Sequence, residues 1–161
     1  MSAPLVPGGA SYLVVAIGTD PVTADVARAW TAEAEGAAPT TLVVLDSMTV
    51  VADRDVLAEM LGRARVGVRI LLVGGRYDAL QACAFTRAHG ALPHELASRV
   101  THERDLPVYC AHCRDTLRVS AEPGGEAVCP GCGRLLEVHD HLSAVLGSYL
   151  ASDARARKLA S

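Results

Sequence analysis

Two closely spaced cysteine pairs constrain this chain more than any other feature of its sequence. The pairs are Cys110-Ala-His-Cys113 and Cys129-Pro-Gly-Cys132, and fifteen residues separate them. Two residues between cysteines allow a tight turn to direct both sulfur atoms at one ion, and a spacer of this length is typical of zinc sites built from two such turns. The sequence therefore predicts a four-cysteine zinc ribbon over residues 106–138.

The identity of the metal is a separate question. Four thiolates close a tetrahedron around an ion and leave no open position, which is the arrangement of a structural zinc site. Tetrahedral sulfur also holds a single iron, and the stretch 129–133 resembles a turn that rubredoxin-like iron proteins share with zinc ribbons. We expect Zn²⁺, because the whole loop is shorter than in a rubredoxin, and iron is the alternative. His112, inside the first pair, is expected to be exposed or to contact a partner.

Composition places the chain among cytoplasmic globular proteins. Half of its residues are apolar and only 4% are aromatic, so Val, Leu, Ile and Ala must form most of the core. No apolar run reaches the length that crosses a bilayer, and the N-terminus lacks the order of a secretory signal. Thiols stay reduced in the cytoplasm, which favours a metal site over disulfides or accidental pairs. The fifth cysteine, Cys83, is expected in the core.

The charge distribution argues against nucleic acid as a partner. The net charge is −3, and residues 106–161 contain six basic and six acidic residues. A ribbon that binds nucleic acid usually presents a basic face, because phosphate neutralisation supplies most of the affinity. We therefore expect neither a nucleic-acid partner nor a membrane.

Upstream of the cysteines, apolar runs alternate with helical patterns. Strands are predicted over 12–17, 40–45 and 68–73, with a less regular one within 95–103. Helices are predicted from Pro21 behind an Asp20 cap, from a cap at Asp53, and over 77–89. This alternation implies right-handed crossovers and a parallel sheet. The fold class is thus α/β, a small three-layer, mostly parallel sheet resembling half of a Rossmann fold over residues 11–105.

This architecture invites a nucleotide site, but the chemistry of one is missing from the sequence. There is no GxGxxG and no Walker A sequence. Asp20 would repel an anion at the start of the first helix. Gly74-Gly75 could approach a ligand, although a tight turn explains the pair better, and Asp46 alone is weak evidence for a ribose site. No catalytic and no cofactor-binding residue is predicted.

Both ends of the chain carry simpler patterns. Residues 1–10 contain two prolines and two glycines, so a flexible tail is expected. Residues 139–161 are expected to form a C-terminal helix, since apolar residues recur at helical spacing from Leu142 to Leu150. His139 and His141 are expected to cap or dock this helix, or to bind a second ion.

The C-terminal region resembles one family in the order and spacing of its residues. The stretches are Tyr109–Cys113, 129–138 with its Cys-Pro-Gly-Cys-Gly turn, His139-Asp-His141-Leu-Ser143, and Gly147-Ser-Tyr149-Leu150. They are similar to the DmmA-like subunit of bacterial dimethylamine monooxygenase, a haem-dependent oxidative N-demethylase complex. The match is strong over about residues 108–150 and looser in the preceding α/β segment.

This resemblance implies a subunit of an NAD(P)H- and O₂-dependent complex that demethylates dimethylamine or a similar secondary amine. Its expected partners are a haem-binding monooxygenase subunit, a flavin (FMN) and [2Fe–2S] reductase subunit, and a folate-binding subunit, which hold those cofactors. The chain alone would be a non-catalytic assembly subunit whose only site residues are the metal ligands Cys110, Cys113, Cys129 and Cys132. Two alternatives are a rubredoxin-like one-electron carrier and a free-standing zinc-ribbon adaptor or regulator.

Overall fold

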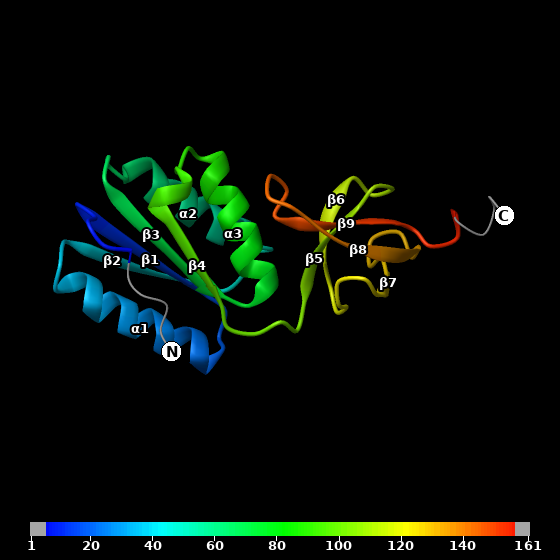
Figure 1. The fold of residues 1–161 in the computed structure, drawn as a ribbon, viewed down its shortest axis with the longest axis horizontal. Coiled ribbons are helices and arrows are strands. Elements are labelled where there is room, and N and C mark those ends of the chain that lie inside the picture. The colour runs from blue at the N-terminus through cyan, green and yellow to red at the C-terminus, as the bar shows by residue number, and fades with distance from the viewer. Residues whose placement is uncertain (1–5, 157–161) are drawn as a thin grey trace.

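The computed structural model of the chain describes residues 6–156 and contains two sheets with separate cores. The first sheet and its helices form one body, and the second sheet lies beyond α3 at the other end of the long axis (Figure 1). None of the helices in the described part of the chain is long and apolar enough to cross a membrane.

The first sheet is fully parallel, with the strand order β2-β1-β3-β4. This confirms the α/β class with a parallel sheet. The elements in chain order are β1 (Ser11–Ile17), α1 (Pro21–Glu35), β2 (Thr40–Leu45), α2 (Val51–Arg63), β3 (Val68–Gly74), α3 (Arg76–Ala88), the short 3₁₀ helix η1 (Pro93–Glu95) and β4 (Leu96–Val100).

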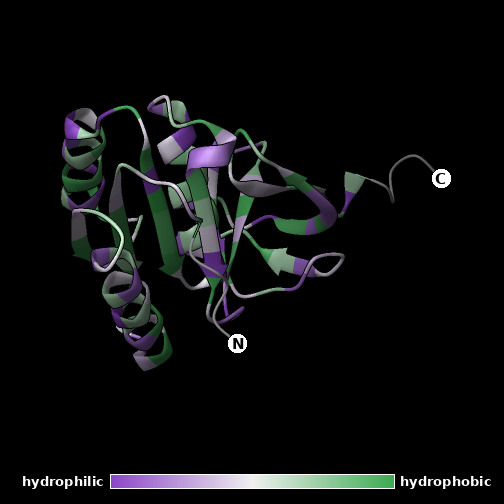
Figure 2. Ribbon diagram, turned by 60° about the vertical axis from the view of Figure 1, so that its left-hand side comes forward, coloured by the Kyte–Doolittle hydropathy of each residue, from purple (hydrophilic) through white to green (hydrophobic). Residues whose placement is uncertain are grey.

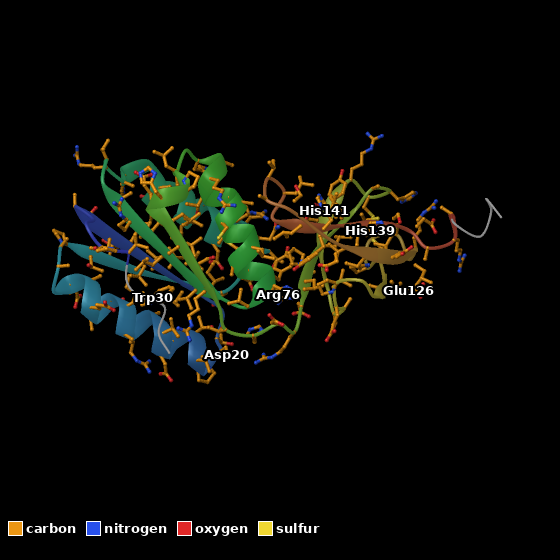
Figure 3. All side chains as sticks on the ribbon, viewed as in Figure 1. Asp20, Trp30, Arg76, Glu126, His139 and His141 are labelled. Carbon is orange, nitrogen blue, oxygen red and sulfur yellow. The ribbon has the colours of Figure 1, made fainter. Side chains whose placement is uncertain are left out.

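Helices cover both faces of this sheet because its central strands are apolar on both sides. Tyr12, Val14 and Ala16 of β1 pack with Trp30 of α1 on one face. On the opposite face the alternate residues of β1 pack with Leu57 of α2 and with α3. The central strands are accordingly mostly green in Figure 2, while the helices alternate between purple and green residues. Figure 3 shows Trp30 on the α1 side of the sheet.

Of the two predicted helix caps, one is confirmed by the structure and the other is wrong. Asp20 caps α1 as predicted, since its side chain accepts a hydrogen bond from the Val22 N–H at 3.0 Å. Asp53 does not cap α2, which begins after Val50. The Asp53 carboxylate instead reaches back to the N–H groups of Asp46 and Ser47, at 2.8 and 2.9 Å, and holds the loop after β2.

The second sheet has the strand order β6-β5-β9-β8-β7. Within residues 6–156 its only parallel pair is β5 with β9. Its small core joins aliphatic residues of the strands to Cys110 and Cys129. The strands are β5 (Leu106–Cys110), β6 (Asp115–Val119), β7 (Glu126–Val128), β8 (Leu135–Ser143) and β9 (Ser148–Asp153).

The predicted C-terminal helix is wrong over the part of it that the structure describes. Residues 139–153 belong to β8, a turn and β9, and residues 157–161 lie outside the described range. The apolar residues at helical spacing are not a buried face, because Val145 is 87% exposed. Alternation governs this segment instead: Leu136 and Val138 of β8 are buried and Glu137 between them is not.

The expected flexible tail is shorter than ten residues. The Ala10 N–H donates to the Gly67 carbonyl at 2.8 Å, and the Tyr12 hydroxyl donates to the Val6 carbonyl at 3.1 Å. Val6 also packs against the core on the α1 side. Residues 6–10 are therefore attached to the first sheet, while residues 1–5 lie outside the described range.

Candidate metal centre

Turns at the ends of two strands bring the four predicted cysteines together. Cys110 is the last residue of β5, and Cys113 lies in the turn that leads to β6. Cys129 directly follows β7, and Cys132 lies in the turn that leads to β8. The four sulfur atoms all lie within 4.8 Å of one another, as in a site that could hold a metal ion.

The two turns have the same backbone geometry. The residue after each second cysteine has a positive φ, 55° at Arg114 and 71° at Gly133. Its N–H donates to the carbonyl of the first cysteine, from Arg114 to Cys110 and from Gly133 to Cys129, both at 2.8 Å. Glycine suits the left-handed conformation, whereas a side chain there is disfavoured. Arg114 is the one non-glycine residue with positive φ in the described chain. The fold therefore imposes this turn although the backbone conformation is unfavourable for arginine.

The sulfur–sulfur distances fit a tetrahedral thiolate site. Cys113 Sγ lies 3.6 Å from Cys129 Sγ, and Cys110 Sγ lies 3.8 Å from Cys132 Sγ. Zinc–sulfur bonds of about 2.3 Å in a tetrahedron separate the sulfur atoms by about 3.8 Å. The donor set and its spacing therefore suit an ion such as Zn²⁺, and each close contact joins one turn to the other.

Burial of the cluster makes free thiolates unfavourable without a cation. Cys110 and Cys129 are buried, and Cys113 and Cys132 are partly buried. Burial, followed by hydrogen bonds shared with the other three cysteines, raises the pKa of the Cys113 thiol to about 12. A bound cation would stabilise the thiolate forms, so metal binding would release protons.

Gly131 provides a direct test of the packing around the sulfur atoms. A Cβ at this position would lie 2.9 Å from Cys113 Sγ, closer than such atoms pack. We expect Gly131→Ala to weaken metal binding by roughly tenfold or more, the size of effect seen when groups that orient ligands are disturbed. Competition with a chelator measures this loss. Gly62→Ala is the matched control, since a Cβ there meets no atom within 4 Å; equal metal retention in both variants would contradict the geometry.

Other residues singled out from the sequence lie away from the four sulfurs. His112 is exposed. His139 contacts Ser152 across the β8–β9 pair, with Nε2 and Oγ 2.9 Å apart, so it does not dock a helix. His139 and His141 lie on the second sheet (Figure 3). They form no metal-ligand cluster within residues 6–156. Cys83 of α3 is buried in the core of the first sheet, as expected.

The glycine pair after β3 is explained by packing. Backbone and side-chain atoms of Ile17 face Gly74, and a Cβ there would lie 2.8 Å from the Ile17 carbonyl oxygen. The imidazole of His102 lies directly against Gly75, which precedes α3. The His102 carbonyl also accepts a hydrogen bond from the Arg76 N–H at 2.8 Å. The pair therefore serves a tight strand-to-helix turn covered by the chain after β4.

An arginine from the second sheet reaches the carboxyl end of the first. Arg118 of β6 donates through Nη2 to both carboxylate oxygens of Asp78 in α3, each at 2.9 Å, and to Ser47 Oγ at 2.9 Å. Its Nη1 lies 3.3 Å from an Asp105 oxygen, and its guanidinium stacks 4.0 Å from the Tyr77 ring centre. We call this group of five residues the Arg118 clamp. All of these residues except Tyr77 line a cavity of about 320 Å³ at the carboxyl end of the first sheet, where ligands of parallel sheets usually bind.

The turn between β8 and β9 makes a second contact between the two sheets. This turn, orange in Figure 1, reaches α3. Gln81 of α3 donates through Nε2 to the carbonyls of Leu146 and Gly147, at 2.9 and 2.8 Å. Gly147 packs so closely that a Cβ would lie 2.5 Å from the Leu80 carbonyl oxygen. The two sheets are thus joined through α3 at two places.

The Arg118 clamp was not predicted from the sequence. Arg118 is one of several arginines in the C-terminal region, and its partners Asp78 and Ser47 lie 40 and 71 positions away in the chain. Asp78 gives a weak local signal, because an acidic residue in the first turn of a helix is also an ordinary favourable choice. Asp78 can be recognised as a partner of Arg118 only from the packing of β6 against α3.

Fold and cysteine geometry define the class of this chain: a parallel α/β body followed by a β domain with a four-cysteine cluster of metal-site type. Residues 107–151 match the family described as dimethylamine monooxygenase subunit DmmA-like, C-terminal domain. That range contains all four cysteines and Arg118. The heme-dependent oxidative N-demethylase delta subunit of Ectopseudomonas mendocina (strain ymp) is 37% identical over 95 residues.

Together these matches confirm the resemblance to the DmmA-like family. The aligned residues make up 59% of this chain and 53% of the relative, so the chain spans about half the length of the curated relative that it matches. No solved structure matches the chain.

Proposed function

We propose that this chain is a metal-stabilised assembly subunit of a haem-dependent oxidative N-demethylase. The observation that carries the proposal is the four-cysteine cluster within a domain that matches the DmmA-like family. In this role Cys110, Cys113, Cys129 and Cys132 bind one Zn²⁺. The ion supplies folding energy to a β domain whose own core is small.

The four thiolates would occupy every position of a tetrahedral ion. We therefore assign the oxygen chemistry to other subunits and a structural role to this one. The name of the relative, a delta subunit, supports partners in a multisubunit enzyme. The proposed partners are the haem-binding monooxygenase subunit, the flavin and [2Fe–2S] reductase subunit, and the folate-binding subunit. The proposed substrate is dimethylamine or a similar secondary amine, and the proposed location is the cytoplasm.

Rigid attachment of the β domain to the α/β body suits an assembly role. The Arg118 clamp and the Gln81 contacts fix the metal centre relative to α3. A subunit that positions others benefits from such a fixed geometry, because less conformational freedom is lost on binding. Arg118 also lines the cavity at the carboxyl end of the first sheet.

Co-expression with the other subunits of an N-demethylase tests the proposal. The tagged wild-type chain is expected to co-purify with them, and NAD(P)H-dependent demethylation of dimethylamine is expected to fall when this chain is omitted. The chain alone is expected to show no demethylation. A complex that assembles and turns over equally well without this chain would overturn the proposal.

One observation favours a second candidate, a rubredoxin-like electron carrier. Cys113 and Cys132, one from each turn, are only partly buried. A sulfur near the surface would give electrons a short path to a partner if the ion were iron. Metal identity separates this candidate from the zinc proposal, because Zn²⁺ has no redox chemistry.

A further inference from the structure

Among the described residues, strand β2 forms an edge of the first sheet that contains neither a charged residue nor a proline. Four strands form sheet edges in the described chain, namely β2, β4, β6 and β7. Proteins usually protect such edges with charged side chains, proline or bulges. Arg99 lies in β4, Asp115 and Arg118 in β6, and Glu126 in β7, whereas β2 is Thr-Thr-Leu-Val-Val-Leu without a charge or a proline.

The backbone of β2 offers alternate hydrogen-bonding groups to a further strand. The carbonyls of Pro39 and Leu45 accept hydrogen bonds from the N–H groups of Tyr12 in β1 and of Gly18, which directly follows β1. The backbone N–H and C=O groups of the odd-numbered residues of β2 therefore point toward β1. Peptide groups alternate in direction along a strand. The N–H and C=O groups of Thr40, Leu42 and Val44 therefore point away from the sheet.

The side chains at this edge are apolar and exposed. Leu42 is 40% and Val44 is 68% exposed. They are in register with Val14 and Ala16 of β1, on the face that α1 covers, but they lie at its outer margin. On the other face, Leu45 is buried in the core with α2. An occupant of this edge would thus bury apolar side chains while pairing with the backbone.

We propose that β2 pairs antiparallel with β2 of a second copy of this chain, about a two-fold axis at Leu42. The outward-facing groups then pair with one another: Leu42 opposes Leu42 of the copy, and Thr40 opposes Val44. The two four-stranded sheets become one continuous sheet. This inference concerns the first sheet alone and stands independently of the proposed function.

The charge pattern favours a second copy as the occupant. A two-fold interface requires a patch that is complementary to itself, and β2 contains no charge that would meet its own image. In this register Asp46, the acidic residue directly after β2, opposes Ala38 of the copy rather than Asp46. Thr41 opposes Val43, which is a favourable cross-strand pair of β-branched side chains.

Charge substitution at the edge tests the interface. The wild-type chain is expected to have the mass of a dimer in analytical ultracentrifugation at micromolar concentration. Val44→Lys should halve that mass, since it places a charge in the pairing strand, and it should leave the circular dichroism spectrum unchanged because the side chain is exposed. Val66→Lys is the control, since Val66 is 98% exposed and lies outside every strand; it should remain dimeric.

A cysteine at the two-fold axis gives an independent readout. Residues that exchange both backbone hydrogen bonds have Cα atoms about 5.5 Å apart, within the range of a disulfide. Leu42→Cys is therefore expected to form a covalent dimer under mild oxidation, and Val66→Cys, although more exposed, is not. A monomeric wild-type chain, or equal cross-linking of both variants, would overturn the proposal. The proposal would also be overturned if the wild-type chain were a monomer and Val44→Lys abolished only its co-purification with the other demethylase subunits. In that case β2 would pair with a strand of a partner.

Discussion

Replacing Cys129 with serine is expected to release the metal and unfold the second sheet, residues 106–153, while the first sheet stays folded. Cys129 is 1% exposed and packs within the small core of that sheet. A structural zinc site supplies about 10 kcal/mol or more of folding free energy at neutral pH, which this core cannot replace. Metal analysis, together with hydrogen exchange of the two sheets, measures both effects.

Cys83→Ala is the matched control for this variant. Cys83 is also a buried cysteine, but it lies in α3 and belongs to the core of the first sheet. It should lose some stability through the small cavity left behind, and it should keep its metal. A Cys129→Ser protein that retains a full equivalent of metal and protected amides in β5 to β9 would show that the ligand assignment is wrong.

Arg118→Ala is expected to destabilise the native chain by about 3 kcal/mol. The substitution leaves the Asp78 carboxylate, whose side chain is 8% exposed, without its guanidinium partner, and a buried charge without its partner is costly. The Met48 N–H and Ser47 hydroxyl would still donate to Asp78, at 2.8 and 2.9 Å, and limit the loss. Urea unfolding of the metal-loaded protein gives the difference in free energy.

Arg134→Ala controls for the removal of any ion pair. Arg134 pairs with Asp153 at 2.6 Å, a shorter distance than in the clamp, but its side chain is 47% exposed. An exposed pair contributes about 1 kcal/mol or less. Faster hydrogen exchange in the first turn of α3 is expected for Arg118→Ala only. Equal effects of the two substitutions would mean that the Arg118 clamp does not join the sheets.

The first sheet could be predicted from the sequence because its signals are local. The strands β1, β2 and β3 are six or seven residues long and consist mostly of apolar residues, and an Asp-Pro start fixes the beginning of α1. The cysteine cluster was equally accessible, since a two-residue spacing determines each turn and the two turns need only meet. In both cases the pattern that predicts the structure lies among residues that are close together in the sequence.

The C-terminal strands and the Arg118 clamp depend on contacts that are distant in the chain. Leu142, Val145 and Leu146 have helical spacing, yet Gly147, with a φ of 60°, turns the chain back so that β9 can pair with β5. That pairing joins residues about forty positions apart and has no local pattern. Likewise, Arg118 pairs with Asp78 only when β6 meets α3.

The metal centre is connected to the first sheet through the contacts that β6 and the β8–β9 turn make with α3. Leu117, next to Arg118 in β6, packs against the core that contains the cysteines. Loss of the ion would therefore disturb β6 and, through it, the clamp on Asp78. We expect the relative orientation of the two sheets to depend on the metal.

Metal analysis of the purified chain, combined with its visible absorption spectrum, shows whether the four cysteines bind zinc or iron. We expect one zinc per chain and no visible absorption, because four thiolates around a d¹⁰ ion give a structural site. One iron per chain with thiolate-to-iron charge-transfer bands would contradict it and place this protein in the electron path of its complex.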